Sequence, residues 1–423
     1  MVDFRFLHTG DIHLDSPLKG LAGHDGPAAD LIRTATRHAF SNFVDLAIAE
    51  DVAFVVIAGD LYDGDWRDYQ TGLFFVRQMG RLAHAEIPVF VIWGNHDAES
   101  QITKRLNLPD NVKVFSSRKP QTFRLEGLPV ALHGQSFRQR DVTENLVPAY
   151  PAPVTGCFNI GILHTGLGGI GGHANYAPCS MDDLVNKGYD YWALAHVHQG
   201  QVLHERPHIV FCGNLQGRHV RETGPKGACL VSVRDGAVEE VTTIRCSAVH
   251  WARLNVAADN AHHLNNIVDG IRHAIARAVA ADDARQLLAC RIEITGPTGL
   301  HAQLAGAIEQ LTAEARAAAL GLGETAAWIE RIIINTEPAL DRSQAGRADP
   351  LGDLHKIVED AAEDGQVAAQ IEDALGDLIR KLPHDLRTEL EAGALLDAVN
   401  GDYKTLIERA GRDLVAQLEA DGA

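Results

Sequence analysis

Paired cysteines, long apolar runs and an excess of basic residues are all missing from this sequence. Its six cysteines form no C-x-x-C pair, which argues against a zinc knuckle and against a disulfide framework. No apolar run approaches the roughly 20 residues that cross a bilayer. The first residues, MVDFRFLHTGD, lack the order of basic, apolar and small residues of a secretory signal. We therefore expect a cytoplasmic enzyme with buried, reduced thiols.

The net charge of −18 is unevenly distributed along the chain. Residues 1–250 carry 22 Lys and Arg against 27 Asp and Glu, whereas residues 251–423 carry 16 against 29. Because phosphate contacts need Lys and Arg, the overall charge argues against tight nucleic-acid binding. The acidity lies mainly in the C-terminal part, however, and bound cations would neutralise some carboxylates of the N-terminal part. An anionic substrate is therefore compatible with the N-terminal part.

Short apolar runs alternate with polar clusters and helical segments in the first 250 residues. This pattern predicts buried strands of an α/β sheet, and the clearest runs are residues 4–9, 52–59, 87–94, 158–165 and 189–195. Further short strands are predicted at 129–137, 208–214 and 227–241, the last with an Asp-Gly hairpin turn. We expect these further strands to form a second sheet packed on the first.

The pattern changes near Trp251 and again after Thr336. Residues 251–336 predict a small α+β unit in which strands alternate with helices at 261–281 and 301–319. A stretch rich in turn formers follows, and then three or four amphipathic helices. With roughly 100 to 200 residues per domain as a guide, we predict domains at 1–248 and 249–337, a linker at 338–350 and a helical region at 351–423.

Five of the apolar runs end in residues that bind metals. In chain order the endings are D-I-H, G-D-L-Y-D, G-N-H-D, a lone histidine and H-V-H, which supply Asp11, His13, Asp60, Asn95, His96, Asp97, His164, His196 and His198. Sheets of this class bind ligands outside the carboxyl ends of their strands, so we expect these side chains at one edge of a sheet. Carboxylate, amide and imidazole ligands suit Mn²⁺, Fe²⁺ or Zn²⁺ better than Mg²⁺.

The ligands are too many for one ion. A carboxylate such as Asp60 can bridge two cations about 3.5 to 4 Å apart. Such a pair lowers the pKa of a shared water and clamps the attacking and leaving oxygens of an in-line displacement at phosphorus. The set therefore predicts phosphate ester hydrolysis, with a bridging hydroxide attacking phosphorus.

Each motif alone has a structural alternative. Asp-x-His follows strands by chance, Gly-Asp before a helix can be a turn with an N-cap, and a lone histidine such as His164 is more often a core residue than a ligand. The five motifs in order, each after an apolar run, favour the metal site.

The ordered set resembles the calcineurin-like metallophosphoesterase superfamily. The segments LHTGDIHLDSP and GNLQGRHVRETGPKGACLV further resemble the SbcD type of DNA-repair nuclease, in particular its YhaO-like branch. The resemblance covers residues 5 to about 233 and implies an α/β fold: a two-sheet sandwich flanked by helices, with a smaller α+β cap domain and a C-terminal helical region. Two positions depart from the family, Ala195 for the usual Gly and Tyr62 for the common Phe.

The resemblance also implies roles for the motif residues. One metal would be held by Asp11, His13, Asp60 and His198, and the other by Asp60, Asn95, His164 and His196, with two Mn²⁺ ions expected and Fe²⁺ or Zn²⁺ as alternatives. His96 would stabilise the transition state or protonate the leaving oxygen. Asp97 would orient His96 through a hydrogen bond.

Several charged residues outside this set have two interpretations. Asp15 and Asp63 are expected to be supporting or capping carboxylates rather than metal ligands. Contacts to a DNA backbone or ordinary surface salt bridges are both compatible with Arg138, Arg140, Arg218, His219 and Arg221.

Three functions are compatible with the sequence. The first is a DNA exo- or endonuclease in DNA repair, whose family implies a homodimer and C-terminal helices that dock on an SbcC-like coiled-coil ATPase; these helices could instead pack on their own domain. The second is a phosphodiesterase or phosphatase for a small molecule, since G-N-H-D in place of G-N-H-E disfavours a phosphoprotein substrate. The third, a non-catalytic scaffold, predicts degenerate ligands, and none is missing.

Overall fold

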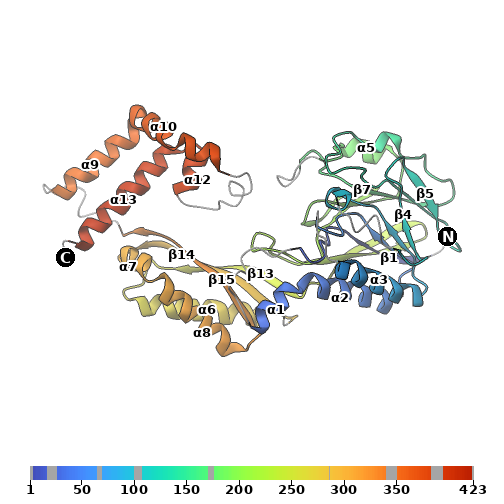
Figure 1. The fold of residues 1–423 in the computed structure, drawn as a ribbon, viewed down its shortest axis with the longest axis horizontal. Helices are drawn as coiled ribbons and strands as arrows, with labels where there is room; N and C mark the ends of the chain where they lie inside the picture. Colours follow the sequence, from blue (N-terminus) through green and yellow to red (C-terminus); the bar gives the residue numbers. More distant parts are fainter. Residues whose placement is uncertain are drawn as a thin grey trace. The chain divides into compact units, whose positions relative to one another are not determined.

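The computed structural model of this chain describes residues 3–16, 26–63, 69–99, 107–169, 176–284, 286–339, 350–382 and 394–421 (Figure 1). The chain divides into two units, Met1–Ala252 with Gln286–Leu288, and Arg253–Arg285 with Ala289–Ala423. The predicted boundary at residue 248 lies close to the end of the first stretch. Most of the predicted linker, residues 340–349, lies outside the described residues.

Two six-stranded sheets form the frame of the first unit. The first sheet has the order β12 (Ala237–Arg245), β11 (Gly227–Arg234), β1 (Phe4–Thr9), β2 (Phe54–Ile57), β3 (Val89–Val91) and β4 (Val112–Val114). The second has the order β5 (Gln121–Arg124), β6 (Val130–Gly134), β7 (Phe158–His164), β8 (Tyr191–Ala195), β10 (His208–Cys212) and β9 (Gly200–Glu205). Strands β1 to β4 run parallel, as do β6, β7, β8 and β10.

The distribution of strands between the sheets differs from the prediction. We expected the five main apolar runs in one sheet, but β1, β2 and β3 lie in the first sheet, and β7 and β8 lie in the second. The hairpin of β11 and β12, predicted for the second sheet, belongs to the first, and its turn is formed by Asp235 and Gly236 at φ of 52° and 76°. Strands buried on both faces have the same apolar composition in either sheet, so composition could not assign them.

The two sheets face each other across an apolar core. Alternate residues of β1 point to opposite sides, so that Phe4 and Phe6 join this core while Leu7 packs on the other side of the first sheet. The Phe6 ring stacks on Phe54 at 4.9 Å and meets the edge of Tyr191, from the second sheet, at 5.3 Å. The shared core thus holds the two sheets together.

Helices cover the outer faces of the sandwich. On the first sheet, α2 (Ala35–Ala49) and α3 (Tyr69–His84) bury a row of phenylalanines that includes Phe40, Phe43 and Phe75. On the second sheet, Trp192 and Phe211 pack with residues of α5 (Met181–Asn186) and of the loops beside it. The structure also describes three short helices in this unit, α1 (Pro27–Arg33), the 3-10 turn η1 (Val147–Ala149) and α4 (Asn95–Glu99).

The second unit begins with a three-stranded sheet. Its order is β13 (Val249–Ala257), β14 (Leu287–Thr298) and β15 (Ala327–Pro338). The connecting helices are α6 (Leu264–Ala281), α7 (His301–Gly306) and α8 (Ile308–Leu322), so the helix predicted at 301–319 is divided at Ala307. On neighbouring strands, Arg291 and Glu330 form a bidentate ion pair with two N–O distances of 2.7 Å.

Four helices are described after the sheet of the second unit: α9 (Pro350–Glu363), α10 (Gly365–Lys381), α12 (Ala394–Val399) and α13 (Tyr403–Asp421). Helices α9 and α13 cross closely, since a Cβ on Gly411 would lie 2.1 Å from a methyl of Val358. None of the helices that the structure describes combines the length and the apolar character needed to cross a bilayer.

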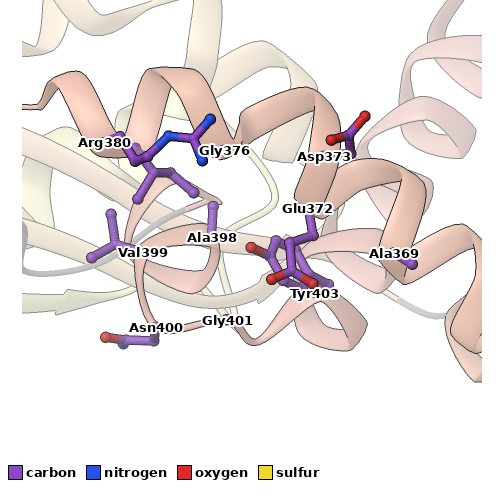
Figure 2. Close-up of a pocket in the computed structure, with 11 residues that line it drawn as sticks. Ala369, Glu372, Asp373, Gly376, Arg380, Ala398, Val399, Asn400, Gly401 and Tyr403 are labelled. Carbon is purple, nitrogen blue, oxygen red and sulfur yellow. The ribbon is translucent and has the colours of Figure 1, made fainter.

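A hollow of about 660 Å³ opens between α10 and residues 398–403 (Figure 2). Glu372, Asp373 and Arg380 line it from α10, and Tyr403 lines it from the start of α13. Among the residues that the structure describes, the lining contains no histidine or cysteine and so offers no mixed ligand set for a borderline cation. Within the part of the chain that the structure describes, groups of three metal-binding side chains occur in the first unit alone.

The buried histidine of β1 makes the stability of the fold sensitive to acid. His8 is fully buried, and its Nδ1 lies 3.0 Å from the hydroxyl of Tyr191. Burial lowers the pKa of His8 from its ordinary value of 6.5 to about 3. The unfolded chain therefore takes up a proton at His8 below about pH 6.5, whereas the folded chain does so only near pH 3. Because protons bind the unfolded chain more readily, the free energy of unfolding decreases as the pH falls through this range.

Replacing His8 should reduce this acid sensitivity. Between pH 8 and pH 5, we expect the wild type to lose about 2 kcal/mol more free energy of unfolding than His8→Leu, measured by urea denaturation of the full chain. His84→Leu, at an exposed position of α3, is the control and should behave as the wild type. Equal losses in the wild type and His8→Leu would contradict the account.

Candidate metal centre

The predicted ligands meet where the two sheets come together. Strand β1 is followed by Asp11 and His13, β2 by Asp60 and β3 by Asn95 at the start of α4, while β7 ends in His164 and β8 leads into His196 and His198. The prediction of a single sheet edge was wrong, because strands of both sheets contribute. The loops after β1 and β2 run side by side, with the N–H groups of Asp11 and Ile12 donating to the carbonyls of Gly59 and Asp60 at 3.0 and 2.8 Å.

The backbone is strained at three of the ligands. Asp11, His13 and Asp60 have φ of 47°, 46° and 52°, in the left-handed region that side chains other than glycine rarely occupy. Neighbouring glycines provide the space for these side chains. A Cβ on Gly94 would lie 2.3 Å from Asp60 Oδ1, and one on Gly59 would lie 2.7 Å from His164 Nδ1. Such strain persists where the surrounding structure fixes it, which is typical of functional sites.

Asp11, His13 and His198 form the first group of candidate ligands. Their ligand atoms lie within 4.8 Å of one another, and His198 Nε2 is 4.0 Å from Asp11 Oδ1. Asp11 and His13 are buried, and among the described residues Asp11 Oδ1 and His13 Nε2 have no hydrogen-bond partner. Buried polar atoms are rarely left unpaired. A cation between these atoms would satisfy them, so the group fits a metal.

Asp60, His164 and His196 form the second group, again with ligand atoms within 4.8 Å. His164 Nδ1 donates to the carbonyl of Ala58 at 3.0 Å, because a carbonyl can only accept. Its Nε2 lies 3.4 Å from Asp60 Oδ2 and 2.9 Å from Asn95 Oδ1. Asp60 Oδ2 is also 3.9 Å from His13 Nε2 of the first group. Asp60 therefore lies between the two groups, as a bridging carboxylate must.

The charges of the second group depend on each other. Burial lowers the pKa of His164, but the nearby Asp60 carboxylate outweighs burial and raises it to about 9. Burial likewise raises the pKa of Asp60, yet its interactions with His164 hold it well below the usual range. The pair thus keeps Asp60 ionised, and a cation bound at His164 Nε2 would take the place of a proton.

Asp63, rather than Asp97, is the carboxylate at His96 Nδ1. The distance from His96 Nδ1 to Asp63 Oδ1 is 2.9 Å, and Asp63 Oδ2 accepts from the hydroxyl of Ser16 at 2.6 Å. Burial lowers the pKa of His96, but the hydrogen bond to Asp63 raises it above its ordinary value. The orienting role that we expected of Asp97 therefore belongs to Asp63.

Asp97 instead fixes the backbone of two loops. Its carboxylate accepts from the N–H groups of Leu61, Tyr62 and Gly94 at 3.1, 2.8 and 3.0 Å. Adjacent residues of a helix do not share a face, which explains why the neighbour of His96 in sequence points elsewhere. Asp97 supports the positions of Asp60 and Asn95 by holding together the loops after β2 and β3.

Only part of the predicted phosphate-binding set lies beside the ligands. Arg218 Nη1 is 3.8 Å from Asp63 Oδ2 and 3.4 Å from Ser16 Oγ, which places this cation next to His96. His219 Nε2 is 3.5 Å from Glu222 Oε1. Arg140 and Arg221 are exposed, and Arg138 pairs with Glu144 at 3.4 Å.

Glu222, which contacts the candidate ligand His198, was not predicted from the sequence. Glu222 Oε1 lies 2.6 Å from His198 Nδ1. The only sequence signal is a carboxylate within the GRHVRE segment that follows the final H-x-H, and a glutamate in a polar loop is too common to single out.

Comparisons with known proteins agree with this geometry. Residues 4–200 match the calcineurin-like phosphoesterase family, and residues 251–337 match the family described as metallophosphoesterase YhaO, middle domain. An uncharacterized metallophosphoesterase YhaO of Bacillus subtilis is 40% identical over 242 residues, which cover 56% of this chain and 59% of that protein. The DNA double-strand break repair protein Mre11 of Sulfurisphaera tokodaii is 29% identical over 210 residues, 47% of this chain and 50% of that protein.

A solved structure is also similar: a dimetal phosphatase from Danio rerio aligns with a TM-score of 0.35 and 12% identity, covering 55% of this chain and 93% of its own. The chain spans only about half to three fifths of the two relatives named above. The family matches and the two-sheet fold agree with the predicted superfamily: residues 4–200 belong to a calcineurin-like phosphoesterase domain, and residues 251–337 are similar to the YhaO middle domain.

Two matched substitutions should separate metal binding from the support of His96. At Mn²⁺ concentrations about 100 times the Kd, we expect each bound ion to stabilise the wild type by about 2.7 kcal/mol, seen as a rise in Tm. Asp60→Asn should lose the rise, because Asp60 lies between both ligand groups. Asp63→Asn should keep it, because Asp63 lies 2.9 Å from His96 Nδ1 but 3.7 Å, beyond hydrogen-bond distance, from Nδ1 of His13.

The control for both variants is Tm in the presence of a chelator, which reports folding alone. A full Mn²⁺-dependent rise in Asp60→Asn would show that Asp60 is not shared by the two ligand groups.

Proposed function

We propose that this metallophosphoesterase is a two-metal phosphodiesterase that cleaves DNA in repair. The observation that carries the proposal is the pair of ligand groups that meet at Asp60, with His96 and Arg218 beside them. The choice of DNA as substrate rests on the similarity to the Mre11 repair protein and on the SbcD-like motifs.

The residues present fit two divalent cations. We propose that Asp11, His13, Asp60 and His198 hold one ion and that Asp60, Asn95, His164 and His196 hold the other. The mixture of oxygen and imidazole ligands favours Mn²⁺, or else Fe²⁺ or Zn²⁺. When bound, such a pair polarises a phosphate oxygen and lowers the pKa of an attacking water.

His96 and Arg218 act on the reacting phosphate in this proposal. Asp63 accepts the hydrogen bond of His96 Nδ1, so the other ring nitrogen is presented to the substrate. From Nε2, His96 donates a proton to the leaving oxygen as the bond to phosphorus breaks. Arg218, held near Asp63 and Ser16, contacts a non-bridging oxygen of the phosphate and balances its charge.

Cleavage of two substrates tests this function. The full chain with Mn²⁺ is assayed on end-labelled linear DNA and on bis(p-nitrophenyl) phosphate, with metal content measured on the same samples. We expect His96→Ala to retain its two metals and to cut DNA about 10² to 10⁴-fold more slowly, which is the usual contribution of a general acid. His84→Ala, at an exposed position of α3, is the matched control and should match the wild type.

The outcomes separate the parts of the proposal. Hydrolysis of the small diester without cleavage of DNA, even with an SbcC-like ATPase present, would keep the phosphodiesterase and overturn the DNA assignment. Wild-type rates in His96→Ala would overturn the role of His96.

We further propose that the C-terminal helices dock on an SbcC-like coiled-coil ATPase, as the resemblance implies. Large apolar side chains are exposed on each of them, namely Ile357 on α9, Leu378 on α10, Leu395 on α12 and Leu414 on α13. A second helix can cover such side chains in a helix-in-groove contact. The acidic charge of this region disfavours DNA as the alternative occupant.

A matched pair of substitutions tests the docking. Ile357 is 63% exposed, and Leu320 on α8 is 65% exposed outside the C-terminal helices. We expect Ile357→Glu to weaken binding of the purified full chain to the ATPase at least tenfold by calorimetry, and Leu320→Glu to leave the Kd unchanged. Equal effects of the two substitutions would argue against the C-terminal helices as the docking site.

A further inference from the structure

One segment of the first unit holds the ligand His198 from two sides. This segment, residues 213–226, connects β10 to β11. The ammonium group of Lys226 donates to the backbone carbonyl of His198 at 2.7 Å. On the imidazole side, Glu222 Oε1 accepts from His198 Nδ1 at 2.6 Å. The backbone and the ring of His198 are therefore fixed by residues of the same segment.

Both oxygens of the Glu222 carboxylate are engaged. Oε2 accepts from the backbone N–H of Arg218 at 2.7 Å and from the amide of Asn214 at 2.9 Å. Glu222 as a residue is only 9% exposed. A buried carboxylate is costly unless it is fully hydrogen-bonded, and these donors supply the bonds. The carboxylate is thus locked in one orientation, with Oε1 directed at His198.

The hydrogen bond to Glu222 selects the form of His198 that binds metals. A carboxylate accepts, so the N–H of a neutral ring lies at Nδ1 and the lone pair lies at Nε2. His198 Nε2 faces Asp11 Oδ1 at 4.0 Å, within the first ligand group. The two ligand groups differ in this respect, because His164 of the second group is oriented by the carbonyl of Ala58.

We propose that Glu222 is a positioning residue for the first metal, acting through His198 and leaving the second metal unaffected. The inference rests on the metal-dependent function proposed above. Carboxylates that hold a ligating histidine commonly change metal affinity by 10 to 100-fold when they are replaced. Because Glu222 would act on the first metal alone, the protein would set the affinities of the two metals separately.

Glutamine is the sharpest replacement, because it keeps the shape of the side chain. Every described partner of the two Glu222 oxygens is a donor, and the amide nitrogen of glutamine is a donor as well. In Glu222→Gln the new amide N–H₂ group therefore faces another donor, either His198 Nδ1–H or the N–H groups of Arg218 and Asn214. The volume of the side chain is kept.

The experiment is a titration of the full metal-free chain with Mn²⁺ by calorimetry, with the unfolding midpoint of each variant measured in chelator. We expect two sites in the wild type, and in Glu222→Gln one site weakened about 10 to 100-fold with the other unchanged. Glu240→Gln, at an exposed position of β12, is the matched control and should retain both wild-type affinities.

A double substitution shows whether Glu222 acts through His198. In the His198→Ala background, Glu222→Gln should cause no further loss of Mn²⁺ affinity, because the residue it positions is already gone. Wild-type affinities at both sites in Glu222→Gln would overturn the proposal. So would equal weakening of both sites, or a full additional effect in the His198→Ala background.

These readouts are independent of the DNA assignment. A chain that binds two Mn²⁺ ions without cutting DNA would remove the proposed substrate and leave the role of Glu222 to be decided by its own titration.

Discussion

The position of the Asp60 carboxylate is the constraint on which the rest of the centre depends. Oδ1 of Asp60 accepts from the N–H of His96 at 3.0 Å, while Oδ2 lies 3.4 Å from His164 Nε2 and 3.9 Å from His13 Nε2. One side chain of the first sheet thus reaches ligands of both sheets. That reach requires the left-handed backbone at Asp60. It also requires glycine at position 94, because a Cβ there would lie 2.3 Å from Asp60 Oδ1. The apolar core between the sheets keeps both halves of the site at this distance.

The grouping of the candidate ligands was predictable from the sequence, whereas the residues that support them were not. Each ligand directly follows an apolar run, so the strand pattern alone located Asp11, Asp60 and His164. The sheet that each strand joins was not predictable, because runs buried on both faces have the same composition. Nor could the sequence decide between Asp63 and Asp97 as the partner of His96, since that choice depends on the direction of side chains in the first turn of α4.

Interactions between distant parts of the chain explain the remaining differences. Glu222 contacts His198 only because the segment after β10 returns to the end of β8, and no local pattern signals that return. Ala195 stands where the family usually has glycine, and its methyl lies against Gly10, a contact that the sequence did not reveal. A Cβ on Gly10 would lie 2.5 Å from the Ala195 methyl. The methyl that replaces the family glycine therefore requires glycine at position 10, in the loop that carries Asp11.

The central claim is that the two sheets build one centre for two metals around Asp60. Anomalous diffraction at the manganese edge from crystals of the full chain grown with Mn²⁺ tests it most directly. We expect two peaks in the first unit, one beside Asp11, His13 and His198 and one beside Asn95, His164 and His196, with the carboxylate of Asp60 between them. A single peak, or peaks away from these side chains, would contradict it.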